Sequence, residues 1–513
     1  ETALKLLLTA RFCSAIWCHI TDCDETYNYW EPSHYLLYGT GQQTWEYSPL
    51  YALRSYMYLL IHMVPANVYQ YLLEPNPIVV FYFTRCLLSV GCALSEVYFY
   101  KSVCKEFGIH IARLTLAFFA AFLPSSFSIN ICNAIEMLVH RQEWSRFIKW
   151  VLISGLVVLG PMIWADSLYY GKLTIAPFNI IKYNVFTSHG PNLYGTEPLS
   201  YYIYNGFLNF NFVFLGALCA PIGLLLVWFL VSGRSKDRQS LSHWYSLAPL
   251  YLWLFVFFLQ PHKEERFLFP VYPMICLAGA ISVDVLQKLY FHVKTKLSSV
   301  HIGCHYLQYT AHITLLVLLI CASLGVSRSV AIYKGYYAPM EVMIEANKLG
   351  GSDDIPKDVP INFCVGKEWH RFPSSFFFPS NKYNTIIIYS LAGQLPQPYL
   401  QQENATSVIR PTFNDMNREE PSRYIDVDNC HFLLDLDTGE ETELEPNYSR
   451  MPDTFIIIKS SKFLLASKSH PIFRAFYVPF LSHKYCTYGS YNLLQSTTFK
   501  SMLSPKYKDT RVS

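Results

Sequence analysis

Three acidic residues follow the first apolar stretch of the chain. Asp22, Asp24 and Glu25 lie within four residues of one another, directly after an apolar run that ends near residue 20. A carboxylate at a membrane surface can act as a general base while its lipid-linked substrate stays in the bilayer. An acidic interfacial loop without chemistry is the alternative interpretation of the same pattern. We assign the catalytic base first to Asp24, and failing it to Glu25 or Asp22.

Aromatic residues accompany these acids in the same loop. Tyr27 and Trp30 follow them directly, and Trp45 and Tyr47 come before the next apolar stretch. Aromatic faces suit sugars, and they are also common where a protein meets the membrane interface. We expect Tyr27 and Trp30 to contact the substrate beside the acids.

A short charged turn lies between two later apolar stretches. The sequence QPHKEERFLFPVYP (260–273) carries His262, Lys263, Glu265 and Arg266. A lysine offers phosphate a point charge, and an arginine offers it a planar fork of donors. A snorkelling loop whose charges partly cancel is the alternative, but a plain turn needs far less charge. We therefore predict that these four residues bind the donor phosphate or another part of the substrate.

A third polar segment, 166–203, contains groups that a sugar-binding loop would use. An ordinary polar loop explains this composition equally well. We predict that Lys172 binds substrate, and Asp166 is the acid to consider if the first loop is not catalytic.

The composition is that of a membrane protein. Of the 513 residues, 52% are hydrophobic, 17% are aromatic and only 15% are charged, whereas soluble proteins carry about 25% charged residues. The net charge of +3 and the lack of a Lys/Arg-rich tract argue against nucleic acid as a partner. No P-loop, dinucleotide fingerprint, HExxH or nucleophile elbow occurs. A transferase built from these residues therefore needs a donor that already carries a phosphate leaving group.

Eight apolar stretches are candidates to cross a bilayer, which takes about 20 residues per helix. They are 3–20, 77–99, 109–126, 147–165, 206–231, 244–260, 267–287 and 307–330. A further stretch, 51–72, either spans the membrane or lies in its interface, because Arg54, His62 and Pro65 interrupt it.

Basic residues orient these stretches, because short cytosolic loops are rich in Lys and Arg. Four short connections hold three basic residues each: Lys101, Lys105 and Arg113; Arg141, Arg146 and Lys149; Arg234, Lys236 and Arg238; and Lys288, Lys294 and Lys296. The loops 21–50, 166–203 and 261–266 then face the opposite side of the membrane, as does everything after residue 334.

The alternation of sides fails at one place, between the stretches 109–126 and 147–165. Only about ten residues separate LPSSFS (123–128) from MLVHRQEWSRF (137–147), which is half the length that a crossing needs. Either crossings are missing near 128–135 or one helix is wrongly assigned, and we favour missing sequence.

The character of the chain changes after residue 334, where short β-like runs replace the long apolar ones. These runs are 361–365, 385–391, 431–437 and 454–460, and they predict a compact α+β domain over 334–513. Two glycosylation acceptors, Asn404 and Asn447, agree with a lumenal location. Cys364, Cys430 and Cys486 lie in this polar region, where one disulfide can form.

These segments, in this order, resemble the dolichyl-phosphate-mannose-dependent mannosyltransferases of the endoplasmic reticulum. The first loop and the later H-K/Q-E-x-R-F turn, here HKEERF (262–267), carry the family resemblance. CDETYNYWEP (23–32), TWEYSP (44–49) and GKEWHRFPSSF (366–376) make the chain similar to the α-1,2-mannosyltransferases of asparagine-linked glycosylation. The resemblance covers nearly the whole chain.

The resemblance implies a polytopic α-helical membrane protein with a GT-C-like glycosyltransferase fold. Residues 1–333 would form the multi-pass catalytic domain, and 334–513 a C-terminal lumenal α+β domain. The implied reaction moves mannose from dolichyl-phosphate-mannose in α-1,2 linkage onto dolichyl-pyrophosphate-linked oligosaccharide in N-glycan precursor assembly, with inversion. It needs no metal and no cofactor, and its partners are the two lipid substrates and the bilayer.

Three alternatives remain. A mannosyltransferase of glycolipid-anchor assembly would share the acidic loop and the charged turn, but not GKEWHRFPSSF. A transporter or scramblase would carry its acids within the membrane-spanning helices rather than at a helix end. A non-catalytic subunit is suggested mainly by the apparent missing segment.

Overall fold

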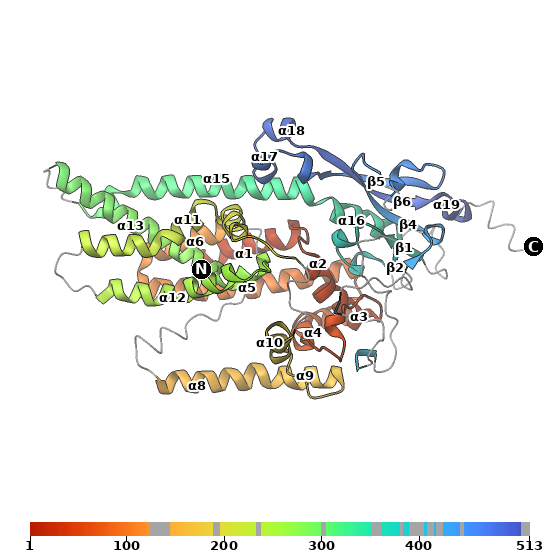
Figure 1. Cartoon of the computed structure of the whole chain (residues 1–513), viewed down its shortest axis with the longest axis horizontal. Helices are drawn as coiled ribbons and strands as arrows, with labels where there is room; N and C mark the ends of the chain where they lie inside the picture. The colour runs from red at the N-terminus through yellow and green to blue at the C-terminus, as the bar shows by residue number, and fades with distance from the viewer. Residues whose placement is uncertain are drawn as a thin grey trace, which may run out of the picture.

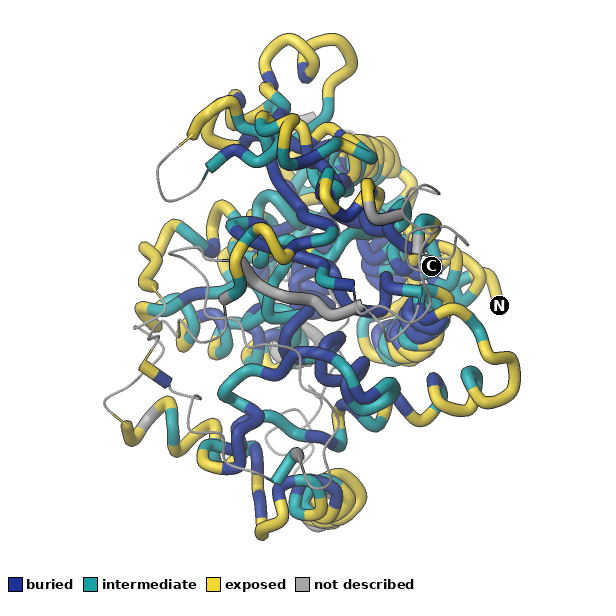
Figure 2. The backbone as a smooth tube through the Cα atoms, turned by 90° about the vertical axis from the view of Figure 1, so that its right-hand side faces the viewer, coloured by how far each residue is buried: buried dark blue, intermediate teal, exposed yellow. Residues whose placement is uncertain are grey.

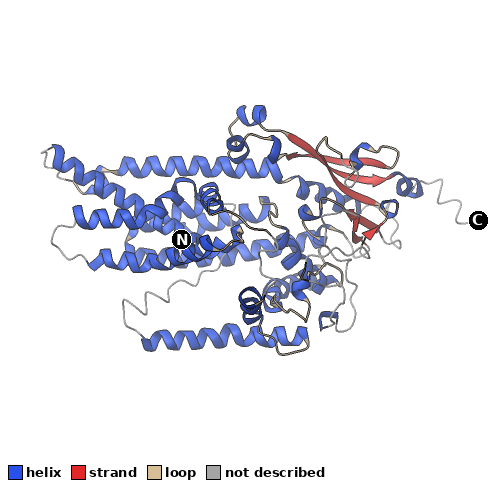
Figure 3. Ribbon diagram, viewed as in Figure 1, coloured by secondary structure: helices blue, strands red, loops and turns tan. Residues whose placement is uncertain are grey.

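The structure is a computed structural model in which long helices run side by side and a β-sheet covers one end of them (Figures 1 and 3). It describes residues 1–122, 144–187, 195–231, 238–298, 304–350, 361–379, 383–388, 405–407, 415–416, 424–441 and 446–503. The end of the molecule that carries the sheet is called the sheet end below.

The helices follow in chain order. The α-helices are α1 Thr2–Trp17, α2 Cys23–Glu25, α3 Glu31–Tyr38, α4 Tyr56–Leu73, α5 Pro77–Phe107, α6 Ile109–Ala121, α8 Trp144–Ser154, α9 Gly160–Tyr170, α10 Ala176–Phe186, α11 Ser200–Leu230, α12 Arg238–Leu259, α13 Tyr272–Ser298, α14 Tyr306–Tyr309, α15 Ala311–Tyr336, α16 Ala338–Gly350, α17 Pro471–Ala475, α18 Leu481–Tyr485 and α19 Thr497–Leu503. Two π-helical turns, η1 Thr26–Trp30 and η3 Gly155–Leu159, join α2 to α3 and α8 to α9. Short 3₁₀ turns are η2 Trp45–Tyr47, η5 Glu265–Val271, η6 Trp369–Arg371, η7 Ser375–Phe377, η8 Ala405–Ser407, η10 Val427–Asn429, η11 Tyr448–Arg450 and η12 Ala466–Lys468.

Among the described residues, five helical segments are long and apolar enough to cross a membrane. They are Pro77–Phe107, Val151–Tyr170, Ser200–Leu230, Glu265–Leu297 and Ala311–Tyr336. The apolar helices Ile109–Ala121 and His243–Leu259 are shorter. The predicted helical membrane fold with a C-terminal sheet region is confirmed. The ambiguous stretch 51–72 forms α4, which contains Pro65 and does not belong to the five spans.

Helix α13 is the centre of the helical part. Figure 2 looks onto the sheet end and shows buried backbone in the middle and exposed backbone around the outside. Of the most apolar window of the span Glu265–Leu297, 83% of the residues are buried, which is the largest share among the five spans. A Cβ at Gly279 would lie 2.4 Å from Cγ1 of Val213, so only glycine lets α13 and α11 approach this closely.

Buried charges connect α1 to α5. Arg11 on α1 forms a two-pronged ion pair with Glu96 on α5, and Nε of Arg11 lies 3.1 Å from Oε2. Both residues are at most 9% exposed. Charges inside a membrane helix bundle are costly unless they are paired, so this contact fixes the position of α1 and of the acidic loop that follows it.

The sheet has six strands: β1 Ile361–Val365, β2 Tyr383–Ile388, β3 Tyr424–Ile425, β4 Phe432–Asp437, β5 Phe455–Leu464 and β6 Tyr488–Ser496. Their order is β3-β2-β1-β4-β6-β5, with parallel pairing from β3 to β4 and antiparallel pairing of β6 with both β4 and β5. The four predicted strands correspond to β1, β2, β4 and β5. Strand β6 was not predicted from the sequence, because Ser490, Asn492 and Gln495 interrupt its apolar pattern.

A disulfide joins two neighbouring strands of the sheet. Cys364 on β1 is bonded to Cys430, just before β4, and the Cα atoms are 5.8 Å apart. Cys486 is buried and unpaired. The sequence left open whether a disulfide forms among the three cysteines, and the structure pairs Cys364 with Cys430. A disulfide of this kind is typical of proteins that fold in an oxidising compartment.

We expect loss of this disulfide to destabilise the sheet. The bridge closes a loop with a sequence separation of 66, and such bridges contribute about 2–4 kcal/mol. Cys364→Ser should lower the thermal unfolding midpoint of the purified protein. Cys486→Ser is the matched control, because it removes a buried thiol without breaking a bond. Equal midpoints for the two variants would contradict the prediction.

Three predictions made from the sequence concern the topology break, the two glycosylation acceptors and the domain boundary. The topology break falls within residues 123–143, and Asn404 also lies outside the described residues. Asn447 is only 1% exposed, and its side-chain nitrogen donates to Oδ1 of Asp437 at 2.7 Å. A glycan would occupy this same nitrogen, so the packing argues against a glycan on Asn447 in the folded domain. The predicted boundary between 333 and 334 lies inside α15, which ends at Tyr336.

Candidate active site

The acidic loop begins a helical segment at the sheet end. Asp22 is the N-cap of α2, and its Oδ1 accepts the backbone N–H of Asp24 at 2.9 Å. This bond satisfies one of the free donors at the helix start, which is the usual role of an N-terminal Asp. Burial and the neighbouring Asp24 raise the pKa of Asp22. Asp22 therefore caps the helix, whereas the carboxylate of Asp24 makes the closer contact with Arg266; the two side chains are 43% and 36% exposed.

Arg266 joins the acidic loop to the charged turn. Its NH1 lies 2.5 Å from Oδ2 of Asp24 and 3.9 Å from Oδ2 of Asp22, and its Nε pairs with Glu264. The two segments that the sequence analysis chose independently are thus in direct contact. We call Asp22, Asp24, Glu264 and Arg266 the carboxylate–arginine cluster.

Backbone contacts hold the charged turn in place. Lys263 is 6% exposed, and its ammonium donates to the carbonyl of Glu197 at 3.0 Å and to that of Gln260. The Nδ1 of His262 lies 2.8 Å from the carbonyl of Gly195, and its Nε2 lies 2.9 Å from Oε1 of Glu264. These contacts attach the turn to the segment 195–198. The phosphate-binding role of Lys263 and His262 stays a prediction.

Glu265 faces away from the acidic loop, toward α11. Its Oε1 accepts the side-chain nitrogen of Asn209 at 2.7 Å and the hydroxyl of Tyr272 at 3.2 Å. These bonds fix the orientation of the Glu265 side chain. Its contact with substrate stays a prediction.

The third acid and the two aromatic residues of the first loop point into the protein. Glu25 accepts the indole N–H of Trp30 at 2.9 Å, and burial raises the pKa of Glu25. The hydroxyl of Tyr27 donates to the carbonyl of Trp369 at 2.8 Å. Tyr27 and Trp30 are 3% and 5% exposed, so both are packed against protein. Their contact with substrate stays a prediction.

Glu31 is a structural residue that the sequence analysis missed. It is fully buried, and it accepts bonds from the Ser374 hydroxyl at 2.9 Å and from the Ser375 N–H and hydroxyl at 2.6 and 2.9 Å. Burial raises the pKa of Glu31, although the bonds from Ser375 oppose this shift. Glu31 thereby attaches the segment 366–376 to the first loop. The sequence did contain a signal for this role. A glutamate within the aromatic run YNYWEP is expected to be buried, and a buried carboxylate needs hydrogen-bond donors.

Asp166 and Lys172 lie at a different place. Asp166 caps α4, since its Oδ1 accepts the Ser55 hydroxyl at 2.9 Å and the Tyr56 N–H at 2.7 Å. Lys172 is exposed in the turn that follows α9. Among the described residues, no hydrogen bond or ion pair joins either side chain to the carboxylate–arginine cluster. Substrate binding by Lys172 stays a prediction.

Asp22, Cys23 and Asp24 also have the spacing of a possible metal site, because their ligand atoms lie within 4.8 Å of one another. Both carboxylates, however, already face the guanidinium of Arg266. Among the described residues this group has its own cation, so it is a poor fit for a resident metal. Metal-independent chemistry remains our expectation.

A helical membrane scaffold that brings a carboxylate and an arginine together at one end has the make-up of a membrane-embedded glycosyltransferase. The chain belongs to the Alg9-like mannosyltransferase family, whose sequence profile matches residues 2–137 and 118–379. It is a multi-pass membrane protein and a glycosyltransferase.

Curated relatives are similar over nearly the full chain. The α-1,2-mannosyltransferase Alg9 of Drosophila melanogaster is 49% identical, over 97% of this chain and 88% of its own length. The α-1,2-mannosyltransferase ALG9 of Homo sapiens is 44% identical, over 98% of this chain and 90% of its own length. The protein of the same name from Saccharomyces cerevisiae is 29% identical over 93% and 91%. No solved structure matches.

The matches also bear on the topology break. The alignment with the Drosophila protein spans 545 positions, more than the 513 residues of this chain, so the relative has residues that this chain lacks. The family profile matches in two parts that overlap at residues 118–137, the stretch where the alternation of sides fails. Both findings favour missing sequence over a wrongly assigned helix.

Proposed function

We propose that this protein transfers mannose from dolichyl-phosphate-mannose, in α-1,2 linkage, onto dolichyl-pyrophosphate-linked oligosaccharide in N-glycan precursor assembly. Membership of the Alg9-like family and the names of the relatives support the α-1,2-mannosyl transfer. The pairing of Asp24 with Arg266 on this scaffold is the observation that carries the proposal.

Asp24 is the proposed general base. It takes the proton from a mannose 2-hydroxyl of the acceptor, and the resulting oxygen attacks C1 of the donor mannose. The bond from C1 to the phosphate oxygen breaks through an oxocarbenium-like transition state, and dolichyl phosphate leaves. One displacement inverts the β-linked donor to an α-linked product.

Arg266 has two roles in this proposal. Its NH1 holds the carboxylate of Asp24 in place. Its guanidinium also places positive charge where the departing phosphate develops negative charge. Fixed donors aimed at developing negative charge lower the energy of a transition state.

The alternatives explain fewer observations. A transporter would use acids within the membrane spans. Glu96 lies within one of them but is paired with Arg11, whereas Asp24 follows the end of α1. A glycolipid-anchor mannosyltransferase does not account for the segment 366–376, which here supplies both hydroxyls bound to Glu31.

The proposed location is the endoplasmic-reticulum membrane, with the sheet end in the lumen. The junction of α5 and α6 and the C-terminal end of α13, which carry basic residues, lie at the opposite end from the sheet (Figure 1). Basic connections favour the cytosol, and the Cys364–Cys430 disulfide favours an oxidising compartment.

This orientation predicts that protease added to sealed microsomes leaves the domain after residue 334 intact. Detergent should then expose the domain to digestion, which serves as the control within the experiment. Complete digestion without detergent would contradict the lumenal location of the site.

The activity itself is tested by an in vitro transfer assay. Purified protein, dolichyl-phosphate-mannose and a defined lipid-linked acceptor should give an acceptor extended by one α-1,2-linked mannose, without added metal. A protein of normal fold that transfers no mannose to any such acceptor would support a non-catalytic subunit instead.

A further inference from the structure

Four basic residues near the end of α1 differ in how their charges are satisfied. Lys263 donates to two carbonyl groups, and Arg266 faces three carboxylates. Arg85 on α5 and Arg328 on α15 have no carboxylate within ion-pair distance among the described residues. Among the described residues, these two arginines therefore lack a counter-charge in contact with them.

Arg85 is almost completely buried. It is 4% exposed, and its NH2 donates to the carbonyl of Cys18 at 2.9 Å. Its Nε and NH1 have no hydrogen-bond partner. Glu25 interacts with Arg85 electrostatically, but its carboxylate accepts its hydrogen bond from the indole N–H of Trp30. Two donors of a buried guanidinium are therefore available.

Arg328 on α15 is in a similar state. Its NH1 donates to the carbonyl of Ala475 at 3.1 Å, and its buried Nε has no partner. It interacts electrostatically with Tyr336 and Glu265, without an ion-pair contact among the described residues. This cation therefore also lacks an anion close to it.

Both arginines act near His19, the second residue after α1 and the third before Asp22. Arg85 donates to the carbonyl of the preceding residue, Cys18, and both guanidinium charges interact with the His19 imidazole. The ring of His19 stacks on Tyr336 of α15, with 6.0 Å between centroids. Two partly unsatisfied guanidinium groups thus lie on the membrane side of the carboxylate–arginine cluster.

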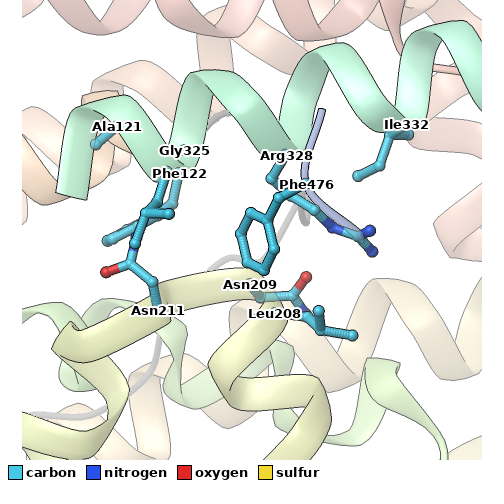
Figure 4. Close-up of a pocket in the computed structure, with 10 residues that line it drawn as sticks. Ala121, Phe122, Leu208, Asn209, Asn211, Gly325, Arg328, Ile332 and Phe476 are labelled. Atoms are coloured by element: carbon cyan, nitrogen blue, oxygen red, sulfur yellow. The ribbon is translucent and has the colours of Figure 1, made fainter. Parts of the chain in front are cut away.

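A narrow pocket begins at Arg328. It is small, and it is lined mainly by apolar side chains such as Phe122, Leu324 and Ile332. Figure 4 shows Arg328 extending from α15, with Asn209 and Asn211 of α11 across from it. Helix α11 is broken at Asn211, which has a φ of 45°. Broken helices in membrane proteins often line substrate sites.

A buried cation without a counter-charge costs several kcal/mol, and inside a membrane protein such a residue usually marks a ligand site. The group that would neutralise these two cations is an anion, and apolar side chains of α6, α11 and α15 surround Arg328. We propose that Arg85 and Arg328 bind the phosphate of a polyisoprenyl-phosphate substrate, whose chain lies against these apolar helices. This inference rests on the proposed function and names where a lipid phosphate is held.

The test measures binding directly, on the full-length protein in detergent. Dolichyl phosphate should raise the thermal unfolding midpoint of the wild type, as a ligand of the native state does. Arg328→Gln and Arg85→Gln should each weaken this binding by about ten- to a hundred-fold, the usual effect of losing a hydrogen bond to a charged group. Lys334→Gln is the matched control, because Lys334 lies on the same helix but is exposed and bonded to Tyr477.

A conservative variant separates binding from folding. Arg328→Lys keeps the charge without the fork, so its affinity should fall between those of wild type and Arg328→Gln. If the Gln variant does not fold, the Lys variant alone decides, because a normal affinity in it overturns the proposal. Equal affinities in wild type and all folded variants overturn it as well.

Two further measurements identify the lipid. They also distinguish failure of the proposed site from failure of the proposed function. A higher KM for dolichyl-phosphate-mannose in Arg328→Gln assigns the site to the donor, and a higher KM for the acceptor assigns it to the pyrophosphate lipid. Arginine-dependent binding of dolichyl phosphate in a protein that transfers no mannose supports the site and refutes the function. Mannose transfer with normal binding in all variants refutes the site alone.

Discussion

Asp24→Asn should lower the rate of mannose transfer by about 10²–10⁴-fold, the usual contribution of a general base. The amide keeps the shape of the carboxylate and its capacity for hydrogen bonds with Arg266, but it cannot accept the proton of the acceptor hydroxyl. The KM for the acceptor should stay near the wild-type value. The measurement is the turnover rate at saturating donor and acceptor, with unfolding midpoints to verify the fold.

The neighbouring acids are the matched controls for Asp24. Asp22→Asn should remain close to normal, because asparagine caps a helix as well as aspartate does. Glu25→Gln should also keep most of its activity, because Glu25 faces Trp30 inside the protein. A dead Glu25→Gln beside an active Asp24→Asn would move the base by one residue. Normal turnover in all three variants would mean that the loop is not catalytic.

Arg266→Ala should lower kcat by about 10²-fold, the usual effect of removing one donor that stabilises transition-state charge. The loss has two physical causes: Asp24 loses the guanidinium that holds it, and the departing phosphate loses a donor. Arg266→Lys should recover part of the rate, since lysine restores the charge but not the planar fork. Single-turnover kinetics are the appropriate measurement, because they separate chemistry from product release.

Arg54 provides the control for Arg266. Arg54 forms a two-pronged ion pair with Glu46 in the same loop, with both N–O distances 3.0 Å, but it lies outside the carboxylate–arginine cluster. Arg54→Ala should therefore affect the unfolding midpoint more than kcat. If Arg266→Ala turns over normally at normal abundance, the charged turn is only structural.

The long elements could be predicted because their signals are local. An apolar run of membrane length predicts a helix wherever it occurs, and the helices α5, α11 and α15 cover most of the stretches 77–99, 206–231 and 307–330. Strand β6 could not be predicted in this way, because its buried side chains depend on β4 and β5 on either side. The alternation of apolar and polar residues along β6 is too irregular to reveal a strand that is buried by neighbours.

The site could be predicted in composition but not in geometry. The sequence indicated Asp24 and Arg266 as separate candidates, and their contact depends on how α1 and α13 pack. Lys263 shows the opposite case, because charge alone suggested a phosphate ligand, while the fold directs its ammonium to backbone carbonyls. The role of Glu31 depends on Ser374 and Ser375, which no local pattern connects to it.

The bond between Glu31 and Ser374 also sets an order of events during biosynthesis. The two residues are 343 positions apart, and ribosomes add roughly 5–20 residues per second, so on the order of tens of seconds separate their synthesis. During that interval the acidic loop has left the ribosome without the donors that fix it. A chain that stops before Ser374 can insert its helices, yet it lacks the partner that completes the loop around Asp24. Nascent and truncated chains are therefore kept from acting on the lipid intermediates of the membrane in which they are made.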